Sequence, residues 1–191
     1  MKIGITDKEE EGNMLKSSKA KAGAARTLLK IMVAGALLGG SVTGCGKTED
    51  PQTLIADAKR YEEKGDHNAA IIQLKNALQK DPDDAEARHF LGTVYNETGD
   101  SASAEKELRK ALSLGMSPDK VIPELGQTLL SMGQFQQVMD ETSKLPEDKR
   151  SAEILTLRGN ASLALGSTEE AKEWFERALR ITHNYPGALI G

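Results

Sequence analysis

Cysteine, histidine and aromatic residues are scarce: the 191 residues include one cysteine, three histidines and 4% aromatics. A single cysteine cannot form a disulfide within the chain or supply several thiolates to a zinc ion. Few aromatic rings leave little surface for stacking on nucleic-acid bases. No uncharged apolar run reaches the roughly 20 residues that span a bilayer. These shortages exclude a disulfide-stapled fold and weigh against base recognition.

Motifs for catalysis are also missing from the sequence. It contains no Gly-x-Ser-x-Gly elbow, no phosphate-binding glycine loop ending in Lys, and no His-Glu-x-x-His pair. The histidines His67, His89 and His183 do not share a helical face at ligand spacing. The acidic run 81–84 lacks the alternating ligands of a calcium loop and suits helix capping instead. We therefore expect no enzyme activity, no metal and no cofactor.

The single cysteine, Cys45, follows a short apolar run at residues 31–38, which itself follows a lysine-rich segment. A basic segment, an apolar segment and small residues are the three parts of an export signal. Residues 1–44 are therefore predicted to be a signal peptide, with a buried core helix as the alternative. Met14 is a possible true start, because the acidic segment 7–11 is atypical of a signal's basic end.

The sequence Val42-Thr43-Gly44-Cys45 resembles a bacterial lipobox. The resemblance implies cleavage before Cys45 and a covalent diacylglycerol with further acyl chains on its thiol; a free or crosslinking thiol is the alternative. One acyl chain binds membranes only marginally, whereas two or three give lasting attachment. Because Gly46 follows the cysteine, the resemblance implies anchoring at the periplasmic face of the outer membrane, with residues 45–50 as a short linker.

Charge argues against a nucleic-acid partner. The predicted signal peptide holds seven basic and four acidic residues, so the remainder of the chain carries a net charge of −7. Nucleic-acid binding needs clustered Lys and Arg to neutralise phosphates. No small-molecule substrate is indicated either.

Glycines recur at a fixed spacing of 33 or 34 residues through the rest of the chain. They stand at Gly65, Gly99, Gly133 and Gly166. Other columns keep the same frame. Seven residues before these glycines stand Ala58, Gly92, Gly126 and Gly159, nine residues after them stand Leu74, Leu108, Thr142 and Phe175, and twelve after them stand Ala77, Ala111, Leu145 and Ala178. A period near 34 predicts stacked helix-turn-helix units.

This pattern resembles the tetratricopeptide repeat. The resemblance implies an all-α, right-handed superhelical solenoid over residues 51–191, with units at about 51–84, 85–118, 119–151 and 152–185 and the start of a fifth at 186. Small residues let the two helices of a unit approach closely, and each recurring glycine ends a first helix in the left-handed region. Trp174 is interpreted as stacking on the fifth unit or as an exposed anchor for a partner.

The third unit departs most from the pattern. Thr142 stands where a large apolar residue is expected, and Leu145-Pro146 closes the second helix early. We expect a shortened second helix, either as a hinge or as ordinary repeat degeneracy. Pro123 is placed in the first turn of this unit's opening helix, where its missing N–H is tolerated.

In tetratricopeptide arrays the first helices line a concave groove. Carried over by position, the groove residues here are Ile55, Lys59, Glu62, His89, Thr93, Asn96, Gln127, Leu130, Asn160 and Leu163. Amides can pair with main-chain groups and aliphatics can fill side-chain pockets, so this mixture suits an extended peptide or a partner helix. We therefore expect a protein or peptide partner in the cell envelope.

The lipobox, the linker and the stretch "AAIIQLKNALQKDPDDAEARHFLGTVYNETGD" together resemble the tetratricopeptide lipoproteins of the PEP-CTERM/exosortase system. That resemblance implies a membrane-anchored scaffold associated with exopolysaccharide export and PEP-CTERM protein sorting. Two alternatives stay open: a pilotin or outer-membrane assembly lipoprotein that binds a secretin or barrel subunit, and the N-terminal repeat region of a larger enzyme.

Overall fold

A computed structural model describes residues 50–183 and 185–189, and every regular element in these ranges is helical. The predicted signal peptide and Cys45 lie outside the described residues. The elements are α2 (Pro51–Glu62), α3 (His67–Lys80), α4 (Ala85–Glu97), α5 (Ser101–Ser113), α6 (Pro118–Ser131), α7 (Phe135–Ser143), η2 (Glu147–Lys149), α8 (Ala152–Ala164), α9 (Thr168–Ile181) and α10 (Pro186–Leu189). No helix in these ranges combines the length and the apolar character that crossing a membrane requires.

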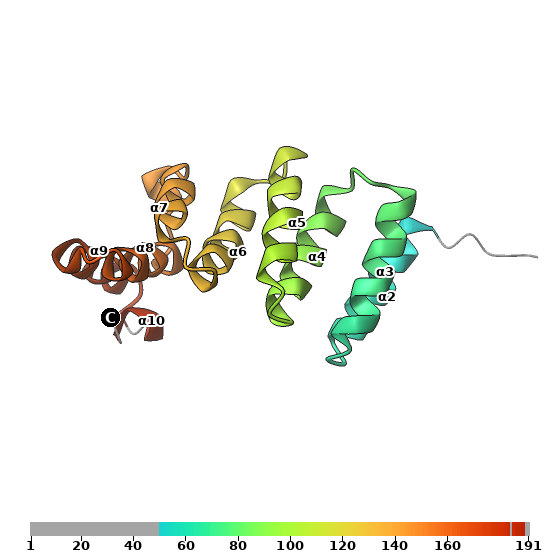
Figure 1. Cartoon of the computed structure of the whole chain (residues 1–191), viewed down its shortest axis with the longest axis horizontal. Helices are drawn as coiled ribbons and strands as arrows, with labels where there is room; N and C mark the ends of the chain where they lie inside the picture. Colours follow the sequence, from blue (N-terminus) through green and yellow to red (C-terminus); the bar gives the residue numbers. More distant parts are fainter. Residues whose placement is uncertain (1–49, 184, 190–191) are drawn as a thin grey trace, which may run out of the picture. The chain divides into compact units, whose positions relative to one another are not determined.

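The helices pack as successive pairs. α2 packs on α3, α4 on α5, α6 on α7 and α8 on α9, and each pair also contacts the next one along the chain (Figure 1). The first helices of neighbouring pairs touch as well, α4 with α6 and α6 with α8. The all-α repeat fold predicted from the sequence is confirmed.

Helix ends are set by aspartates and glycines in repeating places. The carboxylates of Asp66, Asp84 and Asp100 each accept a hydrogen bond from the backbone N–H three residues on, at 2.9–3.1 Å. These caps satisfy N–H groups that the first turn leaves unpaired. At the other end of the first helices, the four periodic glycines have φ between 71° and 82°. Their predicted left-handed conformation is confirmed.

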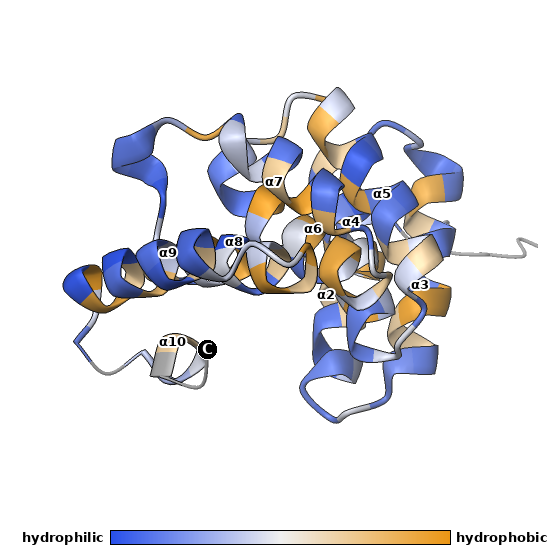
Figure 2. Ribbon diagram, turned by 60° about the vertical axis from the view of Figure 1, so that its left-hand side comes forward, coloured by the Kyte–Doolittle hydropathy of each residue, from blue (hydrophilic) through white to orange (hydrophobic). Residues whose placement is uncertain are grey.

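Two helices of a pair approach closely where a glycine faces a large side chain. A Cβ added to Gly92 would lie 2.7 Å from Cγ of Leu108, and one added to Gly159 would lie 2.5 Å from Cε1 of Phe175. Only glycine leaves room for these side chains at this separation. Figure 2 shows α9 with a hydrophobic and a hydrophilic side, and its buried residues Ala171, Phe175 and Ala178 belong to the core that α9 shares with α8.

The third pair is irregular, as expected. α7 has nine residues, against 13 or 14 in the other second helices, so the predicted shortening is confirmed. The placement of Pro123 in the first turn is wrong. α6 begins at Pro118, so Pro123 lies in the second turn, where it cannot donate to the carbonyl of Asp119.

The chain turns back against the fourth pair after α9. α10 contacts both α8 and α9, and Ala188 is buried in a small core with Leu155, Phe175 and Ala178. Trp174 packs against the same core, and its ring also lies against two guanidinium groups, 4.3 Å from Cζ of Arg158 and 4.8 Å from Cζ of Arg177.

Candidate partner-binding face

The predicted groove residues lie on the first helices of the four pairs. α2 carries Ile55, Lys59 and Glu62, α4 carries His89, Thr93 and Asn96, α6 carries Gln127 and Leu130, and α8 carries Asn160 and Leu163. We call the surface they share the first-helix face. Because first helices of neighbouring pairs are in contact, side chains from adjacent repeats can meet on it.

Three of the predicted residues join one polar network between α4 and α6. Nε2 of His89 lies 3.2 Å from the carboxylate of Glu124, and the hydroxyl of Thr93 donates to the same oxygen at 2.7 Å. Oδ1 of Asn96 accepts from the hydroxyl of Thr128 at 2.8 Å. The network fixes these side chains and ties the second repeat to the third.

Glu124 and Thr128 are members that sequence reasoning missed. Glu124 stands 31 residues after Thr93 and Thr128 stands 32 after Asn96, each close to one repeat period. Polar residues nearly one period apart on first helices are therefore the signal that could have revealed the pairs. Both residues are polar, so they do not belong to the apolar columns from which the core is predicted.

A second cluster joins Glu62 of α2 to His67 and Glu97. Nδ1 of His67 lies 2.6 Å from Oε1 of Glu62 and 3.5 Å from Oε2 of Glu97. A hydrogen bond with Glu62, partial burial and repulsion from the Glu62 carboxylate raise the pKa of Glu97. Glu97 therefore binds a proton more readily than an isolated glutamate does.

These three side chains are also the group best arranged to hold a metal ion within residues 50–183 and 185–189. Each offers one ligand atom, and the three atoms lie within 4.8 Å of one another. A histidine nitrogen with two carboxylate oxygens is a donor set that zinc and other transition metals accept. This cluster was not predicted from the sequence, because Glu62 and Glu97 come from different repeats.

Ile55 does not offer its side chain to a partner. It is 8% exposed and lies in the core of the first two pairs with Leu54, Ala58 and Leu91. Two adjacent apolar residues on α2, Leu54 and Ile55, are both buried because α3 packs on that helix and the core extends to residues of α4. The assignment of Ile55 to the groove is therefore corrected.

The remaining predicted residues have more accessible side chains. Lys59 and Gln127 are exposed, and Asn160 is half-buried. Leu130 is half-buried and packs against the core of the third pair. Leu163 is 40% exposed and lines a cavity of about 370 Å³ between α8 and α9, together with Phe175 and Leu179. Lys59, Gln127, Asn160 and Leu163 are thus the first-helix residues best placed to contact another molecule.

Comparison with protein families identifies the repeats. Two family models described as tetratricopeptide repeat match residues 61–116 and 152–185. The stretch between the matches contains the irregular third pair. MamA from Desulfovibrio magneticus RS-1 has a similar fold, with a TM-score of 0.67 at 18% identity over 72% of this chain and 78% of that one.

Two named relatives come from bacterial surface systems. The type IV pilus assembly protein PilF of Pseudomonas aeruginosa is 26% identical over 170 residues, 81% of this chain and 68% of PilF. A solved structure of P. aeruginosa PilF superimposes with a TM-score of 0.59, covering 75% of this chain and 66% of that one. Cellulose synthase operon protein C of Escherichia coli K12 is 25% identical over 122 residues, 64% of this chain but only 9% of its own length. Residues 61–116 and 152–185 of this chain thus match tetratricopeptide repeats, and the paired helices of the fold agree with those matches.

Proposed function

We propose that this protein is a non-enzymatic scaffold of the bacterial cell envelope that binds a protein partner during assembly of a pilus or a related surface structure. The observation that carries the proposal is the match to PilF, which spans 68% of that protein and 81% of this chain. Proteins of this repeat family bind other proteins, and the first-helix face offers amide, charged and aliphatic side chains suited to a peptide.

The proposed attachment to the membrane rests on the sequence around Cys45. Lipidation of its thiol would hold the repeats at the periplasmic face of the outer membrane. Cleavage before Cys45 would leave only residues 45–50 between the lipid and α2. The partner would therefore be met close to the membrane surface.

A second candidate function is exopolysaccharide export, which the match to cellulose synthase operon protein C supports. That match covers 9% of the relative, so most of that much longer protein has no counterpart in the residues compared. The association with PEP-CTERM protein sorting rests on the sequence resemblance alone. The pilus-type role is favoured because its relative is matched over most of its length.

Crosslinking in the native cells distinguishes the two roles. The full-length lipoprotein is crosslinked in place, and its partners are recovered and identified by mass spectrometry. Recovery of pilus-assembly components supports the proposed role, and recovery of polysaccharide-export components supports the second candidate. Recovery of neither class of partner would refute both.

The first-helix face can be tested in the same experiment. Replacing Gln127 and Asn160 together by alanine removes one exposed and one half-buried amide from the first-helix face, and should reduce partner recovery at least severalfold. The matched control replaces Asn68 and Gln79, an exposed amide pair on α3. Equal recovery with both double variants would place the partner elsewhere. Asn96 is unsuitable for this purpose, because its replacement would also disturb the contact with Thr128.

A further inference from the structure

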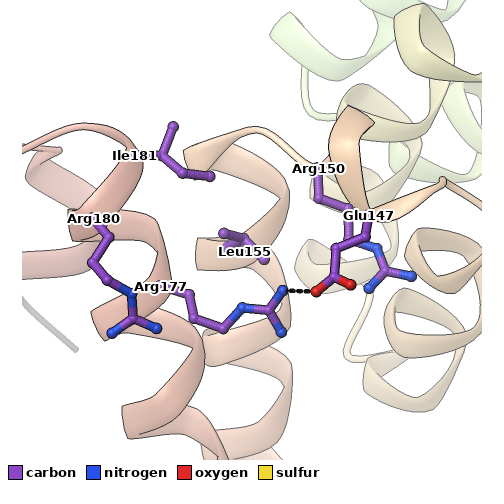
Figure 3. Close-up of a pocket in the computed structure, with 6 residues that line it drawn as sticks. All are labelled: Glu147, Arg150, Leu155, Arg177, Arg180 and Ile181. Carbon is purple, nitrogen blue, oxygen red and sulfur yellow. Dashed lines mark hydrogen bonds and ion pairs between the residues drawn. The ribbon is translucent and has the colours of Figure 1, made fainter.

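A basic pocket lies away from the first-helix face, between the turn after α7 and the helices of the fourth pair. It has a volume of about 240 Å³ and is lined by Glu147, Arg150, Leu155, Arg177, Arg180 and Ile181 (Figure 3). None of the predicted groove residues lines it. Three guanidinium groups therefore share a small cavity with one carboxylate.

Of the three arginines, one follows η2 and two are on α9. The side chains of Arg150 and Arg177 are held in place by other residues. Arg150, just after η2, donates from Nε to the carbonyl of Leu145 at 3.1 Å. Arg177 of α9 rests against the ring of Trp174 and reaches across to the carboxylate of Glu147 (Figure 3). Arginine side chains fixed in this way lose less conformational entropy when they bind an anion.

Several positive charges gather in this region. Within residues 50–183 and 185–189, neither Arg150 nor Arg180 forms an ion pair. Arg158, whose guanidinium also lies against the ring of Trp174, is 9% exposed. Burial, then repulsion from Arg150 and from Arg177, lowers the pKa of Arg158, while Glu170 acts in the opposite direction. An additional anion in the pocket would relieve this repulsion.

Glu147 shows which kind of anion the pocket accepts. Its carboxylate already pairs with Arg177, so the guanidinium is oriented for a carboxylate group. The side chain of Glu147 is 72% exposed and stands on the short helix η2. An exposed ion pair contributes little free energy, so a competing carboxylate can displace it at small cost.

The walls of the pocket add an apolar requirement. Leu155 lies at its base, and Ile181, which is 57% exposed, stands at its edge. A ligand that carries an aliphatic side chain beside its carboxylate would cover these surfaces as well as bind the arginines. Inorganic phosphate would satisfy the charges but leave the apolar walls exposed to water.

We propose that this pocket binds a carboxylate of a short acidic and aliphatic segment of a partner protein, in place of Glu147. The inference rests on the proposed role as a protein-binding scaffold and names the chemistry of one contact in that role. It gives the scaffold a second attachment point, separate from the first-helix face.

The only tryptophan of the chain provides the readout, because Trp174 touches Arg177 and any ligand that moves Arg177 changes its surroundings. The full-length chain, purified in detergent, is titrated with the N-acetylated peptide Glu-Leu-Glu-Leu bearing a free C-terminus. Trp174 fluorescence and calorimetry are both recorded. We expect saturable binding with a 1:1 stoichiometry that weakens at high salt.

Three variants sharpen the test. Glu147→Gln removes the internal competitor and should tighten peptide binding about threefold or more. Arg177→Met and Arg180→Gln should each weaken it, the first at least tenfold. Arg60→Met is the matched control, since Arg60 is an exposed arginine on α2 that pairs with Asp57 of the same helix. Circular dichroism confirms folding, and Arg180→Gln keeps the test valid if Arg177→Met unfolds, because Arg180 is exposed.

Two outcomes would overturn the proposal. Equal affinity for the peptide Gln-Leu-Gln-Leu amide would show that carboxylates are not required. Binding of inorganic phosphate with no binding of the acidic peptide would assign the pocket to phosphate groups instead. Neither result depends on the cellular partner, so this inference can fail while the crosslinking result stands, and the reverse also holds.

Discussion

Arg158 donates a hydrogen bond from Nη1 to the hydroxyl of Thr142, at 3.0 Å, in the interior of the array. Both residues break the apolar repeat pattern. Thr142 occupies the position of Leu108 and Phe175, and Arg158 immediately precedes Gly159 as Leu91 precedes Gly92. Two polar residues at core positions are thus hydrogen-bonded across the joint between the third and fourth pairs, while Nε of Arg158 has no partner within residues 50–183 and 185–189.

This pairing predicts that changes at the two positions are strongly coupled. Thr142→Val should destabilise the protein by about 1–3 kcal/mol, because it leaves a buried guanidinium N–H without its acceptor. Arg158→Leu removes that donor and restores the apolar pattern, so the double variant should lose less stability than the two single variants combined. The coupling free energy, expected at about 0.5–3 kcal/mol, is measured by urea unfolding of all four proteins. Additive effects would show that the hydrogen bond contributes nothing to the joint.

Gly159 should tolerate no side chain. A Cβ there would lie 2.5 Å from Cε1 of Phe175, which is itself buried. Gly159→Ala should therefore destabilise the fourth pair by about 1–3 kcal/mol through overpacking, measured as a lowered urea midpoint. Shortening the opposing side chain in Gly159→Ala/Phe175→Leu should recover part of the loss. A neutral Gly159→Ala would mean that α8 and α9 can separate freely.

The cap of α4 should contribute measurably to stability. Asp84 accepts a 2.9 Å hydrogen bond from the N–H of Ala87. Asp84→Ala should cost about 0.5–2 kcal/mol in thermal or urea unfolding. Asp83→Ala is the matched control: Asp83 is exposed and forms only a surface ion pair, with Lys110 at 3.3 Å, so it should cost much less. Equal losses would show that net charge and not capping is responsible.

The pH dependence of stability should reflect Glu97. Its pKa is raised above the ordinary 4.5 by the hydrogen bond with Glu62, by burial and by repulsion from Glu62 and Glu124, while His67 acts in the opposite direction. The folded chain therefore binds this proton more tightly than the unfolded chain does. Its contribution favours folding below pH 4.5 and is lost as the pH rises through the raised value.

Glu97→Gln should therefore change the stability of the protein more favourably at neutral pH than at pH 4. Melting temperatures of the variant and of the unchanged protein across that pH range measure the difference. Glu63→Gln, at the equivalent position one repeat earlier, is the control and should show no such difference. A Glu97→Gln variant that loses stability at neutral pH would instead mean that the carboxylate's attraction to His67 outweighs the repulsion.

Anchoring through Cys45 is tested by Cys45→Ser. Without the thiol no thioether to lipid can form, so an uncleaved precursor or a soluble exported form should accumulate, visible by fractionation and by the mass of the chain. Ser41→Ala, four residues earlier, leaves the cysteine intact and should not change the fractionation. Membrane partitioning unchanged in Cys45→Ser would refute the lipid anchor.

The repeat fold was predictable because its signal is periodic. The glycines that end first helices stand at Gly65, Gly99, Gly133 and Gly166, and each position makes the same local demand on the backbone. Capping by aspartates at helix starts was predictable for the same reason. Such local requirements recur once per repeat and can be recognised in one sequence without knowledge of distant contacts.

Contacts between repeats were not predictable in the same way. Glu124 reaches His89 and Thr93 because α4 and α6 are in contact, and Glu97 reaches His67 because α3 and α4 are in contact. The inward orientation of Ile55 depends on the core that α2 shares with α3 and α4. The basic pocket depends on the turn that the short α7 leaves before α8, and nothing in a periodic pattern indicates where such a turn will place its arginines.

The short third pair has a consequence for where the array could be cut. In place of a large residue from α7, Leu157 of α8 fills the space before Gly126, with its Cδ1 2.9 Å from where a Cβ would stand. Ile154 and Leu157 of α8 are buried in the same core as Leu125 of α6. A chain that ended after α7 would therefore leave an apolar face of the third pair open to water.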